Sequence, residues 1–224
     1  MMDTKLFFQA FSKFLIGLII ICILLFIPAG TVNYPNGWLF IALLFIPMFF
    51  AGIIMLFKSP DLLRRRLNAK EEEDEQKTVI LVSGIIFLLA FILAGLNFRF
   101  GWFNLPSIVV IIASVIFLLA YIMYAEVLRE NEYLSRTVEV SENQKVVDSG
   151  LYGIVRHPMY TSTIFLFLSM PLVLDSIFSF IVMLVYPIII ICRIRNEEKV
   201  LENELAGYKE YKEKVKYKLI PFLW

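Results

Sequence analysis

The chain has 224 residues, 59% of them hydrophobic, a mean hydropathy of +0.77 and a formal net charge of +1. A soluble domain is about 45–50% apolar and needs polar residues to cover its surface, so this composition excludes a soluble enzyme. The near-neutral charge gives no indication of a nucleic-acid partner. The single histidine and two distant cysteines, both in apolar runs, give no indication of a metal site or a disulfide.

Long apolar runs predict an all-α, polytopic membrane protein with about six transmembrane helices, because a helix needs roughly 20 apolar residues to cross a bilayer. The predicted spans cover residues 8–28, 38–57, 79–96, 106–127, 159–174 and 177–192. The first run follows Lys5 and Lys13 as in a signal peptide, but we interpret it as a retained span. The last two spans are short and contain Pro171 and Pro187, which predicts a tight, locally broken helical hairpin.

The basic residues predict the orientation. Twenty of the 21 lysines and arginines lie in four segments: 1–13, 58–78, 128–156 and 193–224. The short connections at 29–37, 97–105 and 175–176 hold only Arg99. Six spans place these two groups on opposite sides of the membrane. The positive-inside rule therefore predicts that both termini face the cytosol.

We expect two parts within one membrane domain. Residues 1–127 form four spans with a charged cytosolic loop at 58–78, whose stretch 64–77 reads as a solvated connector without a catalytic role. Residues 128–224 form the catalytic region: a cytosolic loop, the hairpin and a C-terminal helix. Within it, β-branched alternation over 136–157 predicts an ordered loop or short hairpin, and 195–214 predicts a helix of mixed charge.

The densest polar cluster runs from Gly150 to Tyr160 and leads into the fifth span. Pro158 suits the first turn of a helix, whose N-terminal end attracts a carboxylate. Tyr152 and Tyr160 offer flat faces for an aromatic ligand or a sulfonium cation. Taken alone, Tyr160 fits the aromatic belt of a membrane interface equally well. We interpret His157, the only histidine, as functional.

A second cluster contains Arg193 and Glu197, where the sixth span leaves the membrane. Residues four apart share a helix face, so both side chains can reach one cavity. A charge at the centre of a membrane costs roughly 2.5–3.5 kcal/mol, which requires a reason. The alternative is that both side chains snorkel to the headgroups, and position alone does not decide between the two.

The two clusters together resemble the isoprenylcysteine carboxyl methyltransferase (ICMT) family, whose superfamily includes membrane phospholipid methyltransferases. The resemblance rests on the order Gly-x-Tyr-x-x-x-Arg-His-Pro-x-Tyr, then Arg-x-x-x-Glu-Glu, Tyr-x-x-Tyr and a terminal Leu-Ile-Pro, over about residues 136–221. One departure is Ser162, where the family often has glycine or another small residue.

The resemblance implies an S-adenosylmethionine (SAM)-dependent methyltransferase with its cofactor site at the cytosolic face. The implied cofactor-binding residues are Val146, Val147, Tyr152, His157, Pro158, Met159, Tyr160 and Glu197. Arg193 is the implied contact of the methyl-accepting carboxylate, so Arg193 and Glu197 are the candidate catalytic residues. An ionised carboxylate needs no general base, and catalysis then consists of positioning and charge stabilisation.

The acceptor stays open at this point: an isoprenoid carboxylate, a lipid headgroup amine or a small hydrophobic thiol. One alternative is a membrane sterol or steroid reductase, which has a related Arg-His-Pro region that binds a nicotinamide cofactor. Those enzymes are usually longer and carry acidic residues where this chain has Thr161 and Ser162. A transporter or scaffold predicts ionisable residues within the spans, which hold almost none. The sequence does not predict an oligomeric state.

Overall fold

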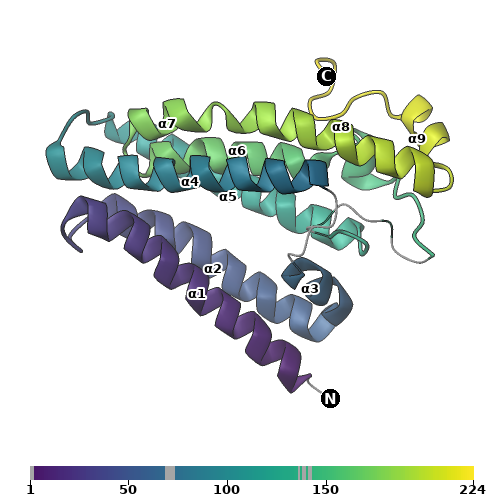
Figure 1. Cartoon of the computed structure of the whole chain (residues 1–224), viewed down its shortest axis with the longest axis horizontal. Coiled ribbons are helices and arrows are strands. Elements are labelled where there is room, and N and C mark those ends of the chain that lie inside the picture. Colours follow the sequence, from purple (N-terminus) through teal and green to yellow (C-terminus); the bar gives the residue numbers. More distant parts are fainter. Residues whose placement is uncertain (1–2, 69–73, 136, 138–139, 141–142) are drawn as a thin grey trace.

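The computed structural model describes all residues except 1–2, 69–73, 136, 138–139 and 141–142. Among the described residues the regular elements are all helical, which confirms the predicted all-α class (Figure 1). The long helices are α1 (Thr4–Ala29), α2 (Pro35–Lys58), α4 (Asp74–Phe100), α5 (Ser107–Glu130), α6 (Pro158–Val173) and α8 (Tyr186–Glu204). The short elements are α3 (Pro60–Leu67), the 3-10 helix η1 (Gly150–Gly153), α7 (Ile177–Met183) and α9 (Tyr208–Lys214).

Five helical segments are long and apolar enough to cross a membrane, if α7 and α8 are taken together as Ile177–Glu204. Their outward faces carry many exposed large apolar side chains, such as Ile16, Phe50 and Leu81, as expected for a surface covered by lipid. The fold is therefore that of a multi-pass membrane protein. α6 has 16 residues and spans about 24 Å, less than the roughly 30 Å of a hydrocarbon core.

α6 is short but central. It packs along α5 and has the largest share of buried residues among the long helices, including Leu166, Met170 and Val173 in the main hydrophobic core. Because other helices surround α6, little of its surface faces lipid. Its first turn carries the motif residues and lies at one end of the bundle.

The expected break near Pro187 is present. α7 ends at Met183 and α8 begins at Tyr186, because Pro187 lacks the N–H that would continue the helix. Pro171 lies inside α6, two residues before its end. The turn that follows α6 is held by hydrogen bonds from α4 and from the connection between α4 and α5. The Asn97 amide donates to the Asp175 carbonyl at 2.8 Å, and the Leu105 N–H donates to the Asp175 carboxylate at 2.6 Å.

Within the 58–78 loop, the stretch 64–77, which we expected to be a solvated connector, begins inside α3, so its first residues are helical. α3 buries Leu62 and Leu63. Arg65 and Arg66 face the segment that follows α5, whereas Arg64 pairs with Asp3 and Asp61. Arg66 donates to the Ser135 carbonyl at 2.9 Å and to the Tyr124 hydroxyl. α3 is thus amphipathic: its leucines are buried, and guanidinium groups on its other side donate hydrogen bonds to the neighbouring loop. Residues 69–73 of this segment lie outside the described residues.

The region 195–214 forms two helices and not the single helix that we expected. α8 ends at Glu204, and Gly207 adopts a left-handed conformation (φ 85°) that redirects the chain into α9. Tyr208 and Tyr211 then pack with Leu205 into a small second core. In the described part of 136–157 the regular element is η1 and there is no strand; residues 136, 138–139 and 141–142 lie outside it.

Both termini, α3 and α9 lie at one end of the bundle, and the short connections between α1 and α2, α4 and α5, and α6 and α7 lie at the other (Figure 1). The described parts of the segments that hold the basic residues other than Arg99 thus belong to the same end. This end also carries the polar residues of the two sequence clusters.

Candidate active site

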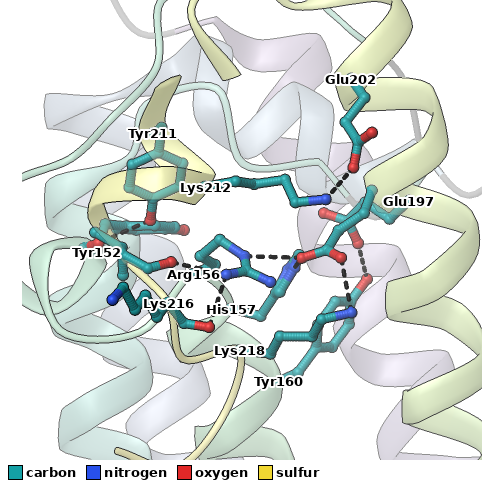
Figure 2. Close-up of polar contacts among 12 residues, drawn as sticks. Tyr152, Arg156, His157, Tyr160, Glu197, Glu202, Tyr211, Lys212, Lys216 and Lys218 are labelled. Carbon is teal, nitrogen blue, oxygen red and sulfur yellow. Dashed lines mark hydrogen bonds and ion pairs between the residues drawn. The ribbon is translucent and has the colours of Figure 1, made fainter. Parts of the chain in front are cut away.

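The first turn of α6 joins the two clusters through Tyr160. Arg193 and Glu197 lie one turn apart on α8, as the spacing predicts. The Arg193 Nε donates to the Tyr160 hydroxyl at 2.9 Å. That hydroxyl donates to Glu197 Oε2 at 2.5 Å (Figure 2). A buried phenol thus links the guanidinium and the carboxylate, so the two side chains face one site.

Glu198, the neighbour of Glu197, faces the other way and forms a buried ionic cluster. Its Oε1 lies 2.9 Å from Arg156 Nε and 3.2 Å from His157 Nε2, and its Oε2 lies 2.8 Å from Lys218 Nζ. Figure 2 shows these three partners side by side. Arg156, His157 and Glu198 are each at most 6% exposed. The sequence analysis did not identify Glu198 as a separate anchor, because two adjacent glutamates do not reveal which one faces inward.

The C-terminal segment braces the same motif. The backbone N–H groups of Arg156 and His157 donate to the carbonyls of Tyr217 and Lys218, both at 2.9 Å. Arg156 Nη1 donates to the Val215 carbonyl at 2.7 Å. The Arg-His pair is therefore fixed by its backbone and by its side chains, so a ligand meets a preorganised surface.

Tyr152 is positioned from two sides. The Asn131 side-chain amide donates to the Tyr152 hydroxyl at 3.0 Å. The Tyr211 hydroxyl donates to the Tyr152 carbonyl at 2.7 Å (Figure 2). Gly150 precedes it with φ 54°, and a Cβ atom there would lie 1.6 Å from the Glu130 carboxylate. That carboxylate accepts the Leu151 N–H, so glycine is required at this turn.

These residues surround an open cavity with a volume of about 100 Å³. Of the predicted site residues, all but Pro158 line it: Val146, Val147, Tyr152, His157, Met159, Tyr160, Arg193 and Glu197. Pro158 instead occupies the first position of α6. The structure thus brings together side chains that lie up to about 50 positions apart in the sequence.

Other lining residues were not predicted: Asn131, Tyr133, Leu134, Ser135, Thr137, Gln144, Lys145, Arg156, Leu201, Leu205, Tyr208 and Tyr211. Most precede the Gly-x-Tyr motif or follow the Glu-Glu pair, where no spacing rule selects individual positions. The Tyr-x-x-Tyr pattern was the one available signal for the last two.

Burial sets the protonation of the tyrosines outside the spans. It raises the pKa of Tyr152, Tyr208 and Tyr211 above the usual value for a phenol. Nearby carboxylates, including Glu198 and Glu197, raise the pKa of Tyr208 further. These hydroxyls therefore stay protonated at physiological pH and can donate hydrogen bonds.

Fold and site together define a multi-pass membrane protein with a cavity, lined by polar and apolar residues, at one end of its helical bundle. Residues 108–203 match the model of the isoprenylcysteine carboxyl methyltransferase (ICMT) family. This match confirms the family resemblance of the sequence motifs and supports a membrane methyltransferase in general. It runs from the start of α5 nearly to the end of α8 and includes the residues around Tyr160. No curated protein matches the chain.

Proposed function

We propose that the protein transfers a methyl group from SAM to a hydrophobic acceptor at the cytosolic face of the membrane. The observation that carries the proposal is the bridge from Arg193 through Tyr160 to Glu197 at the wall of one cavity. It sets a cation and an anion side by side where the apolar part of α8 gives way to its charged part.

The lining suits a ligand with cationic, anionic and aromatic parts. Glu197 supplies a carboxylate for cationic groups, and Lys145 supplies a positive charge at the lining for a carboxylate. Tyr152 and Tyr160 supply aromatic faces, and Val146 an apolar wall. SAM, when bound, supplies an electrophilic methyl group on a sulfonium sulfur.

The chain's own residues would then position and neutralise charge. We assign to Arg193 the role of binding the acceptor carboxylate, because its planar guanidinium group can hold a carboxylate in one orientation. Tyr160 fixes the direction of that group through its 2.9 Å hydrogen bond. No residue is required as a general base, because a carboxylate is already ionised at neutral pH. The acceptor is expected to arrive from the bilayer and SAM from the cytosol.

Ligand binding by the purified protein tests the proposal. We expect SAM, and not NADPH, to raise the melting temperature in detergent. Glu197→Gln is expected to weaken SAM binding in calorimetry by about 1–3 kcal/mol, because it removes the charge from a hydrogen-bonded carboxylate. Glu202→Gln on the same helix is the matched control, since Glu202 pairs with Lys212 away from the cavity lining. Stabilisation by NADPH alone would favour the reductase alternative and refute the proposal.

A further inference from the structure

The Tyr208 hydroxyl is buried and has no hydrogen-bond partner among the described residues. Tyr208 is 4% exposed, begins α9 and lines the cavity. Its neighbour one turn on, Tyr211, also lines the cavity but donates to the Tyr152 carbonyl at 2.7 Å. A buried hydroxyl without a partner is destabilising and rare, so the Tyr208 group points to a ligand atom.

The surroundings of Tyr208 define what that ligand group is. The side chain packs in the small second core with Leu205, Val215 and Val146, and Leu205 and Val146 also line the cavity. The turn at Gly207 lies against the same wall of the cavity. A Cβ atom added at Gly207 would be 3.8 Å from the Val146 side chain. These walls are apolar and suit the faces of a flat ring.

Anionic ligand groups fit this end poorly, because the Glu198 and Glu197 carboxylates lie near enough to Tyr208 to raise the pKa of its hydroxyl beyond the effect of burial. Arg156, which also lines the cavity, uses its Nε for Glu198 and its Nη1 for the Val215 and Lys216 carbonyls. What the Tyr208 end offers is a neutral O–H donor beside the apolar side chains of Leu205 and Val146. That combination matches a heteroaromatic ring with an unprotonated ring nitrogen at its edge.

We infer that the Tyr208 end of the cavity holds the adenine ring of the cofactor and that the Tyr208 hydroxyl donates to one of its ring nitrogens. This assignment rests on the proposed function, because it requires an adenosyl ligand. It makes Tyr208 a specificity-determining residue for the base, separate from the Arg193 end where we place the acceptor.

Tyr208→Phe removes the hydroxyl and keeps the ring. We expect calorimetry to show about three- to tenfold weaker binding of S-adenosylhomocysteine, the range for one hydrogen bond. The loss is expected to vanish for one of the three analogues in which N1, N3 or N7 is replaced by C–H, since neither protein can then form the bond. Ligand-free Tyr208→Phe is expected to melt at the wild-type temperature or higher.

Tyr211→Phe is the matched control on the same helix. Because its hydroxyl has a protein partner, its loss is expected to lower the melting temperature of the ligand-free protein. Unchanged binding by Tyr208→Phe, or an equal loss for the parent ligand and all three analogues, would overturn the inference and leave the proposed function standing. Failure of the wild-type protein to bind S-adenosylhomocysteine would overturn both.

Discussion

Glu198 is predicted to be the main electrostatic anchor of the site. Its two carboxylate oxygens lie within 3.2 Å of nitrogens from Arg156, His157 and Lys218. These partners belong to the motif before α6 and to the C-terminal segment, so one side chain ties both to α8. Glu198→Ala would leave the buried Arg156 without its carboxylate partner.

The expected loss follows from this burial. Removal of one partner from a buried ion pair costs about 3–5 kcal/mol. In a domain of 150–250 residues, 1 kcal/mol shifts the melting temperature by roughly 2–4 °C, so Glu198→Ala is expected to lower it by roughly 6–20 °C. Glu198→Gln keeps an acceptor oxygen but not the charge, and an intermediate loss is expected. Differential scanning fluorimetry in detergent measures both.

Glu202→Gln serves as the control for this experiment. The Glu202–Lys212 pair is about one-third exposed on each side, so its loss is expected to cost less than about 1 kcal/mol. Equal melting temperatures for Glu198→Ala and Glu202→Gln would refute the anchoring role. A large loss in Glu198→Ala alone would support it.

Three further predictions concern topology, acceptor and turn geometry. Cysteines introduced at 58–78 and at the C-terminus should react with an impermeant reagent only from the cytosolic side; labelling from outside would contradict the cofactor access that we propose. Arg193→Ala should keep SAM affinity but reduce kcat/KM for a carboxylate acceptor, with partial rescue by lysine; wild-type turnover would instead point to an amine or thiol acceptor. Gly150→Ala should lower the melting temperature through its collision with Glu130, whereas Gly52→Ala, where a Cβ meets nothing within 4 Å, should not; equal effects would show that the Gly150 turn can relax.

The spans were predictable because each depends on a local apolar run. Observed and expected bounds differ mainly at the ends, where α1 begins at Thr4 and α8 continues beyond the membrane to Glu204. Charge and helix propensity over 195–214 gave no sign of the break, which depends on the left-handed Gly207 and on the packing of Tyr208. α3 was missed because its arginines resemble a solvated run until their partners are known.

The candidate site was predictable to the extent that its residues form motifs. The four-residue spacing of Arg193 and Glu197 placed them on one helix face, and the structure adds Tyr160 as the link between them. Glu198 and Tyr208 could not be assigned from the sequence, because their surroundings are built from segments brought together by folding. Burial of a charge and the lack of a partner for a hydroxyl are properties of the packed structure.

The most direct measurement is the transfer of a labelled methyl group. The protein, reconstituted in vesicles, is incubated with methyl-labelled SAM and a lipid extract, and the organic phase is analysed for labelled product. We expect a labelled hydrophobic product with the wild-type protein, and a strongly reduced amount with Glu197→Gln at normal folding. Absence of label from every carboxylate, amine and thiol acceptor supplied, in a folded protein saturated with SAM, would contradict methyl transfer as the function.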